Sequence, residues 1–336
     1  MIISRTPLRI SFAGGGSDLK EFYREHGGAV VSVAIRKYVY LAMHPFFQEG
    51  KIFLKYSESE LVDSVEQIRH KIIREVFELY GIMGVDFNSS ADVPAGTGLG
   101  SSSSFTVGLV NLCNAYTGRV MHRARIAEHA CDIEIERLRE PIGKQDQYAA
   151  ALGGMNFLRF SRDEGVQVES LHLSESRAAA LQNNLRMYYL GTTRSASELL
   201  AQQRSDIAST PGTATRLKKM VKLADDLRAA IRSGNVDVLG DVMHAGWMYK
   251  RELTKGITNE RVEHFYDLAL RNGATGGKLL GAGGSGFLLF YVHQSNQARL
   301  RRALAELTEY PVEFDYDGTS IIYDDQIRQH RAVKAA

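Results

Sequence analysis

The chain has 336 residues, a length that predicts about two domains and a substantial hydrophobic core. Its 41 Lys and Arg residues nearly balance its 39 Asp and Glu residues, and the net charge of +2 argues against a nucleic-acid-binding protein. The longest apolar runs, Tyr38 to Met43 and Phe287 to Val292, are too short to cross a membrane. Only two cysteines are present and no signal peptide is apparent, so a disulfide framework is not expected and the cytoplasm is the expected location.

The first part of the chain has the pattern of strands separated by short helices. Segments rich in Val, Ile and Tyr predict strands, and apolar residues recurring every three to four positions predict helices. Ser17 or Asp18 is expected to cap the first helix, which Gly27 and Gly28 end after His26. Strands are expected at 2–12, 29–43 (one strand or two) and 85–91, and further helices at 65–80, from 105 onward and at 123–140.

The second part combines long amphipathic helices with short strands. Because strands and helices do not alternate as they do in a Rossmann sheet, the expected fold class is α+β. The expected domains are 1–177 and 178–336. Strands are predicted at 155–160, 166–173, 185–190, 278–280, 287–292, 312–314 and 319–323, and helices at 195–207, 213–232, 236–254 and 259–271.

Two of the glycine-rich segments resemble nucleotide-binding loops. Gly281 to Gly286 matches the GxGxxG pattern, but a strand pattern follows it where a dinucleotide-binding loop opens a helix, so that interpretation fails. The segment from Gly96 to Ser104 instead lies between a predicted strand and a predicted helix. Its backbone amides would gather at a helix N-terminus, where a phosphate is favoured. The alternative is a flexible connector in which one serine caps the helix.

The helix predicted at 123–140 carries an acidic residue on its apolar side. On a helical wheel, Glu134 lies among apolar residues that include Ala127, Ala130 and Cys131, whereas Glu136 lies on the opposite, polar side. A carboxylate in an apolar environment is costly unless a cation compensates it. A metal ion or a buried arginine would serve, and a structural salt bridge is the alternative. Asp146, in the polar segment after Pro141, has an ordinary alternative role as a helix cap.

Three segments together resemble the motifs of the GHMP kinases, a superfamily of small-molecule kinases. They are Arg5 to Asp18, with the sequence RTPLRISFAGGGSD, Pro94 to Ser104 and Lys278 to Gly286, in the family's order. Within the superfamily, AGGGSD, the four-serine run and GKQDQY are most similar to kinases of heptose 7-phosphate. Fucokinase-type enzymes share a related first motif.

This resemblance implies both a fold and an activity. The fold would be an N-terminal domain like the second domain of ribosomal protein S5, followed by a ferredoxin-like domain, with ATP and sugar in the cleft between them. The activity would be Mg²⁺-dependent transfer of the ATP γ-phosphoryl group to the anomeric hydroxyl of a heptose 7-phosphate, towards nucleotide-activated heptose for surface glycans. The implied partners are ATP and a sugar phosphate, without nucleic acid or membrane. A homodimer remains open.

The resemblance also implies roles for individual residues. Asp146 corresponds to the catalytic aspartate and Arg9 to the basic residue beside the transferred phosphate, whereas Ser102 and Glu134 correspond to the magnesium ligands. The nucleotide would be bound by Pro94, Gly96, Thr97, Gly98, Leu99, Gly100, Ser101, Ser102 and Ser103. The sugar would be bound by Gly15, Gly16, Ser17, Asp18, Lys144, Arg194, Gly283 and Gly284.

Two other functions remain open at this stage. Glycines replace the Glu-His pair that precedes the sugar-binding acid in galactokinase, which weighs against galactose but leaves a fucokinase-like enzyme. A catalytically silent sugar sensor would lack the base, and the presence of Asp146 and Glu134 argues against it. A 7-phosphate requires basic side chains near the sugar, for which the candidates are Arg24, Lys37, Lys144, Arg194 and Lys278.

Overall fold

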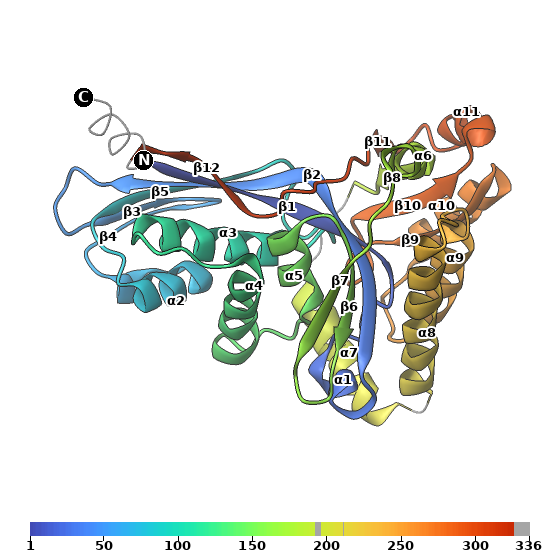
Figure 1. Cartoon of the computed structure of the whole chain (residues 1–336), viewed down its shortest axis with the longest axis horizontal. Coiled ribbons are helices and arrows are strands. Elements are labelled where there is room, and N and C mark those ends of the chain that lie inside the picture. The colour runs from blue at the N-terminus through green and yellow to red at the C-terminus, as the bar shows by residue number, and fades with distance from the viewer. Residues whose placement is uncertain (192–195, 211, 326–336) are drawn as a thin grey trace.

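The computed structural model describes residues 1–191, 196–210 and 212–325. Its larger sheet is built on two long antiparallel strands, β1 (Ile2–Ala13) and β2 (Gly28–Pro45) (Figure 1). The first residues of β2 pair with β6 and its last residues pair with β5, so one continuous strand links two parts of the sheet. The remaining strands of this sheet are β3 (Ile52–Lys55), β4 (Ser59–Val62), β5 (Val85–Ala91), β6 (Met155–Phe160), β7 (Val166–Ser170) and β12 (Ser320–Asp324).

Helices pack against this sheet and bring the glycine-rich loop to it. The central helix is α3 (Ser101–Tyr116), which contacts both long strands and is buried along most of its length. A side chain at Gly108 would crowd Thr6 of β1, so this glycine lets helix and strand approach closely. The neighbouring helices are α1 (Lys20–His26), α2 (Lys71–Tyr80), α4 (Arg123–Cys131) and α5 (Gln145–Leu152), with a 3₁₀ turn, η1 (Val65–Gln67), and a π-helical segment, η2 (Asp132–Arg137).

The smaller sheet has the strand order β11-β8-β10-β9, antiparallel throughout. In chain order this is the fourth, first, third and second strand, with helices after the first and third, which is the ferredoxin-like arrangement. Its strands are β8 (Leu185–Tyr189), β9 (Ala274–Leu279), β10 (Phe287–Val292) and β11 (Thr308–Tyr310). The helices around it are α6 (Glu175–Asn184), α7 (Ala196–Ser209), α8 (Thr213–Arg232), α9 (Leu239–Lys250), α10 (Glu260–Arg271) and α11 (Gln294–Ala303).

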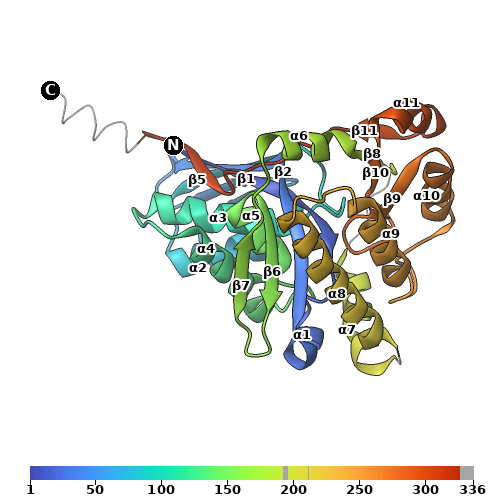
Figure 2. The ribbon, with the colours of Figure 1, turned by 45° about the vertical axis from the view of Figure 1, so that its right-hand side comes forward.

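The two sheets meet through α8 and α9. Figure 2 shows these helices side by side, and α9 contacts both β9 of the smaller sheet and β1 of the larger one. The chain then returns to its start, because β12 pairs with β1. The expected α+β class is confirmed. The expected domain boundary at 177/178 falls inside α6 and stays a prediction. In the described part of the chain, no helix is both long enough and apolar enough to span a membrane.

Several local predictions were wrong. Neither Ser17 nor Asp18 caps α1. The Ser17 hydroxyl instead lies 2.8 and 3.0 Å from the carbonyls of Gly14 and Ala29, to which its one proton can be donated, and Asp18 Oδ1 accepts the Gly16 amide. The helix predicted at 65–80 is divided into η1 and α2, and the one predicted at 123–140 ends in the π-helical segment. Residues 312–314 form only an isolated bridge, between Phe314 and Ile35 of β2, because the pairing with β2 does not extend to a second residue pair. The elements for which no range was predicted are β3, β4, β11, α5, α6 and α11.

Candidate active site

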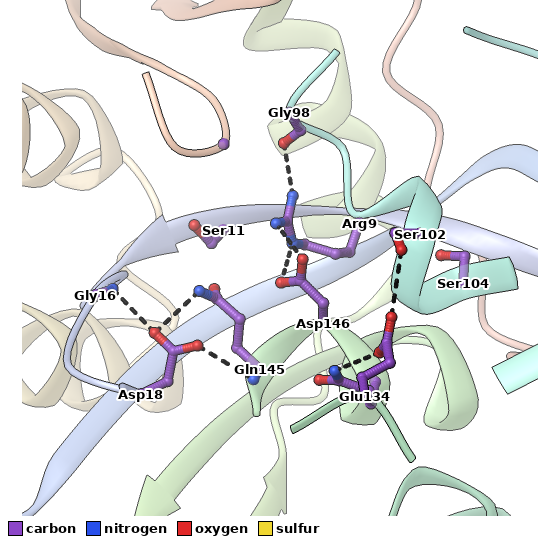
Figure 3. Close-up of polar contacts among 12 residues, drawn as sticks. Arg9, Ser11, Gly16, Asp18, Gly98, Ser102, Ser104, Glu134, Gln145 and Asp146 are labelled. Carbon is purple, nitrogen blue, oxygen red and sulfur yellow. Dashed lines mark hydrogen bonds and ion pairs between the residues drawn. The ribbon is translucent and has the colours of Figure 1, made fainter. Parts of the chain in front are cut away.

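A cleft of about 380 Å³ lies where the glycine-rich loops meet the ends of several elements. The first two motifs enter it from β1 and from the start of α3, and the third from the loop between β9 and β10. The segment from η2 to α5 supplies acidic side chains, and α7 and α9 complete the wall. Segments far apart in the sequence therefore share one cavity, and Figure 3 shows the polar contacts on its wall.

The second glycine-rich loop places the N-terminus of α3 in this cleft. Gly100 is the N-cap and has a left-handed backbone, with φ of 77°. A Cβ atom there would lie 3.1 Å from Oδ2 of Asp146, so glycine is needed for the loop to pass this close to the carboxylate. The first turn of α3 contains no acidic residue. Its free amides and the helix dipole therefore form a site that favours an anion.

The predicted nucleotide-binding residues divide into two groups. Most line the cleft directly: Gly96, Gly98, Gly100, Ser101, Ser102 and Ser103. The others support the loop from behind. The Thr97 hydroxyl donates to the carbonyl of Pro94 at 3.0 Å, and the Leu99 carbonyl accepts the Arg9 amide of β1 at 3.1 Å. These bonds fix the loop against the sheet and hold its open side towards the cavity.

Arg9 and Asp146 form a bidentate ion pair on the wall of the cleft (Figure 3). Arg9 Nε donates to Asp146 Oδ1 at 2.7 Å, and Nη2 donates to Oδ2 at 2.6 Å. The remaining Nη1 donates to the carbonyl of Gly98 at 2.7 Å. Arg9 is 6% exposed and its guanidinium is bonded through three nitrogens, so its orientation is set before any ligand binds.

Asp18 lies beside this pair, at the end of the first glycine-rich motif. Its Oδ1 accepts the Gly16 amide at 2.9 Å and the Gln145 side-chain amide at 3.1 Å, and its Oδ2 accepts the Gln145 backbone amide at 3.3 Å. Burial and, to a smaller extent, the nearby charge of Asp146 raise the pKa of Asp18. Gly15 and Gly16 line the cleft with it, whereas Ser17 is buried behind the turn. This turn presents a carboxylate that is already oriented.

Glu134 is buried, at 1% exposed, and Glu136 is exposed, as the helical wheel predicted. Glu134 Oε1 accepts a hydrogen bond from the Ser102 hydroxyl at 3.3 Å, and Glu134 Oε2 accepts one from the Gln147 side-chain amide at 2.7 Å. Both donors are neutral, and burial raises the pKa of Glu134 to about 7. An uncompensated carboxylate next to a hydroxyl that opens on the cleft fits a hard divalent cation such as Mg²⁺. Within the described residues, no cluster of three or more His, Cys, Asp or Glu side chains exists to hold a metal by itself.

The raised pKa of Glu134 gives stability a particular pH dependence. Folded Glu134 keeps its proton up to about pH 7, whereas the ordinary pKa of this carboxyl group is 4.5, so the folded state binds more protons between these two pH values. Stability therefore falls as the pH rises through this window. We expect Glu134→Gln to remove the loss and to stabilise the nucleotide-free protein at pH 8 by up to about 3 kcal/mol. Urea unfolding at pH 5 and pH 8 in EDTA measures this, and identical pH dependence in both proteins would contradict it.

Among the predicted sugar-binding residues that the structure describes, those that do not line the cleft are Ser17, Lys144, Gly283 and Gly284. Lys144 points to Glu164, with its Nζ 3.1 Å from Oε2 and 3.0 Å from the backbone carbonyl. Gly283 and Gly284 pack against the backbone of Ile257 instead of the cavity, although Gly281 and Ala282 of the same loop do line it. Arg194 lies outside the described residues.

The cleft also contains residues that the sequence patterns did not indicate. Lys250, at the end of α9, and Gln203, in α7, both line it and are nearly buried. Gln145 bonds to Asp18, and Glu140 follows the π-helical segment into the cavity wall. Gln145 lies in the GKQDQY segment next to Asp146 and was within reach of motif reasoning. No local pattern singles out the other three.

A nucleotide-sized cleft between two domains, with a helix N-terminus facing an aspartate and an arginine, is typical of an enzyme that transfers a phosphoryl group. Residues 67–154 match the protein family described as "GHMP kinases N terminal domain", and residues 227–312 match the family described as "GHMP kinases C terminal". Together the two matches cover more than half of the chain. The chain belongs to the GHMP kinases.

The chain is also similar to individual proteins within this family. D-glycero-alpha-D-manno-heptose 7-phosphate kinase of Campylobacter jejuni is 27% identical over 333 residues, which cover 94% of this chain and 96% of the relative. An L-fucokinase/L-fucose-1-P guanylyltransferase of Bacteroides fragilis is 25% identical over 93% of this chain and 37% of its own length. The crystal structure of a D-glycero-D-manno-heptose 1-phosphate kinase from Bacteroides thetaiotaomicron has a TM-score of 0.78 and 24% identity, covering 96% of this chain and 100% of that one. That last likeness concerns the fold.

Proposed function

We propose that this GHMP kinase transfers the γ-phosphoryl group of ATP to the anomeric hydroxyl of D-glycero-D-manno-heptose 7-phosphate, giving the 1,7-bisphosphate. The observation that carries the chemistry is the Arg9–Asp146 pair facing the N-terminus of α3 across one cleft. The full-length similarity to a heptose 7-phosphate kinase supports the choice of acceptor. Gly15 and Gly16, ahead of Asp18, line the cleft without side chains, which favours a bulky acceptor.

Each residue then has a defined task. The amides at the start of α3 bind the β- and γ-phosphates, and Arg9 balances negative charge on the group in transfer. Ser102 and Glu134 would hold Mg²⁺, which supplies further charge neutralisation when it is bound. Asp18 accepts hydrogen bonds from sugar hydroxyls. Catalysis in this scheme is mainly positioning and electrostatics, as phosphoryl transfer requires.

Asp146 accepts the proton of the attacking sugar hydroxyl. Arg9 occupies one lone pair on each of its carboxylate oxygens, and each oxygen has a second one free for the substrate. The same guanidinium holds the carboxylate plane in a fixed direction. Asp146, the base, and Arg9, the cation that binds the phosphoryl group, therefore orient one another. This arrangement places the sugar hydroxyl beside the phosphoryl group that it attacks.

A substrate panel tests the acceptor. ADP release is measured with heptose 7-phosphate, the unphosphorylated heptose, fucose, galactose and a hexose 6-phosphate, and the product is identified by ³¹P NMR. We expect the highest kcat/KM with heptose 7-phosphate and a new phosphate signal on C1. A higher kcat/KM with fucose or any unphosphorylated sugar would overturn the heptose assignment. An absence of ADP release with every sugar would overturn the kinase proposal itself.

A further inference from the structure

Lys250 is a buried cation that forms no ion pair with the residues that the structure describes. It is the last residue of α9, it lines the cleft, and it is 8% exposed. Its ammonium group donates to the carbonyl of Gly281 in the third glycine-rich loop. Among the described residues, no carboxylate forms an ion pair with it. The carbonyls at the C-terminus of α9 favour a positive charge there, but this effect alone is small.

The fold places Lys250 close to Arg9. The loops that carry Gly98 and Gly281 touch, since a Cβ atom on Gly281 would overlap the Cα of Gly98. Arg9 donates to the carbonyl of Gly98, and Lys250 donates to the carbonyl of Gly281. Two cations, one from each domain, are thus attached to two glycines in direct contact. Both line the same cavity.

The surrounding charges do not compensate Lys250. Arg9 and Lys278 repel its ammonium group, whereas Asp18 and Asp146 attract it. Asp146 is already paired with Arg9, and Lys278 is buried with Ser11, whose carbonyl accepts its proton at 2.8 Å. Burial first, and then the repulsion from Arg9, lower the pKa of Lys250 to about 8. A buried ammonium group bonded only to a neutral carbonyl is costly, and an anion in the cleft would offset that cost.

We propose that Lys250 binds the phosphoryl group in transfer, on the side opposite Arg9. This inference rests on the proposed kinase activity and adds a second cation, supplied by the C-terminal domain, to the transition state. Arg9 and Asp146 are bonded to each other, so the group that attacks and the group that is attacked must meet beside them. A phosphoryl group between Arg9 and Lys250 would bring the two glycine-rich loops and their domains onto a single anion.

The γ-phosphoryl group of ATP is one source of such an anion, and the ester phosphate of the sugar is the other. The position of Lys250 favours the γ-phosphoryl group, because Arg9 and Asp146 are both among its charged neighbours, which also include Asp18 and Lys278. Lys250→Met should then weaken binding of the ATP analogue AMP-PNP by about tenfold or more, because a charge-assisted bond is lost. Binding of ADP, which lacks the γ-phosphate, should change less than about twofold. Calorimetry with Mg²⁺ and no sugar measures both affinities.

Four comparisons separate this role from a structural one. Lys255→Met, five positions further along and exposed, should leave both affinities unchanged. Without nucleotide, Lys250→Met should melt at the same temperature as the parent protein or higher, since it removes a buried charge. Lys250→Arg keeps the charge and should retain more affinity for AMP-PNP than Lys250→Met does. In the parent protein kcat/KM should decline above about pH 8, and this decline should be absent in Lys250→Met.

The outcomes are distinct. Equal weakening of AMP-PNP and ADP, or no weakening of either, overturns the proposal. So does a lower melting temperature of Lys250→Met together with an unchanged ratio of the two affinities. If Lys250→Met instead weakens binding of heptose 7-phosphate or a hexose 6-phosphate, but not of AMP-PNP, the lysine binds the sugar ester and the proposal is wrong. Because the nucleotide arms contain no sugar, they remain valid if the true acceptor is not a heptose.

Discussion

Asp146→Asn should lower kcat by roughly 10²–10⁴-fold, the range expected when a positioned general base is lost. The amide has almost the same size and retains one acceptor for the Arg9 guanidinium, but it cannot take the proton of a sugar hydroxyl. It also removes the negative charge next to Arg9, which is nearly buried. Nucleotide affinity should change less than about threefold, because the amides at the N-terminus of α3 are untouched. Single-turnover rates at saturating ATP and calorimetry with ADP measure the two effects.

The same substitution has a cost in stability that must be measured separately. Arg9 keeps one neutral acceptor in place of the two oxygens of a carboxylate, and the loss of a hydrogen bond to a charged group costs about 1.5–3 kcal/mol. The matched control is Asp317→Asn, which removes an aspartate whose Oδ2 lies 3.2 Å from Arg5 Nη2 at the surface. That variant should keep its turnover and its stability, since exposed ion pairs contribute little. A fall in turnover of less than tenfold in folded Asp146→Asn would mean that Asp146 is not the base.

The residues that the sequence predicted best are those whose surroundings are local. Gly96 to Ser102 form a turn between a strand and a helix, and backbone chemistry alone indicates a phosphate site there. Glu134 was correctly predicted to be buried, although the backbone around it is π-helical and not α-helical. Residues that are two positions apart in the sequence lie on nearly opposite sides of either kind of helix. The contrast with Glu136 therefore does not depend on the type of turn.

The residues that were missed or misplaced depend on distant packing. Lys144 was expected in the sugar site because it is close in sequence to Asp146, but Tyr23 and Glu164 draw its ammonium group away. Lys250 was not predicted, because a lysine at the end of an amphipathic helix has no distinctive pattern. It becomes notable only when the loop of Gly281 packs on that of Gly98, more than 180 positions earlier in the chain.

The strand predicted at 312–314 shows the same limitation for the backbone. Val312 and Phe314 are buried and alternate with an exposed residue, as strand residues do. A strand also needs a neighbour over several residues, and the structure provides a single bridge to Ile35. Alternating burial therefore identified the contact with the core correctly and the hydrogen bonding incorrectly. The pattern records which side chains face inward but not which backbone lies beside them.

Glu134 and Glu136 provide a comparison between chemically identical side chains on one segment. If Glu134 holds Mg²⁺ with Ser102, then Glu134→Gln should raise the Mg²⁺ concentration needed for half-maximal rate and lower kcat by about tenfold or more. The amide still fits between Ser102 and Gln147 but presents no negative charge to a cation. Rates measured against free Mg²⁺ at saturating ATP determine both quantities.

Glu136 is exposed, so water compensates its charge and Glu136→Gln should change neither quantity by more than about twofold. A second readout does not depend on turnover: Mg²⁺ should raise the melting temperature of the AMP-PNP complex less in Glu134→Gln than in Glu136→Gln.

Equal Mg²⁺ dependence in the two variants would mean that Glu134 does not bind the metal. The buried carboxylate would then be compensated by its proton, which its pKa of about 7 permits only near or below neutral pH. In that case the rate of the parent protein should fall above pH 7 at every Mg²⁺ concentration. With the metal in place, added Mg²⁺ should restore that rate, because the cation displaces the proton.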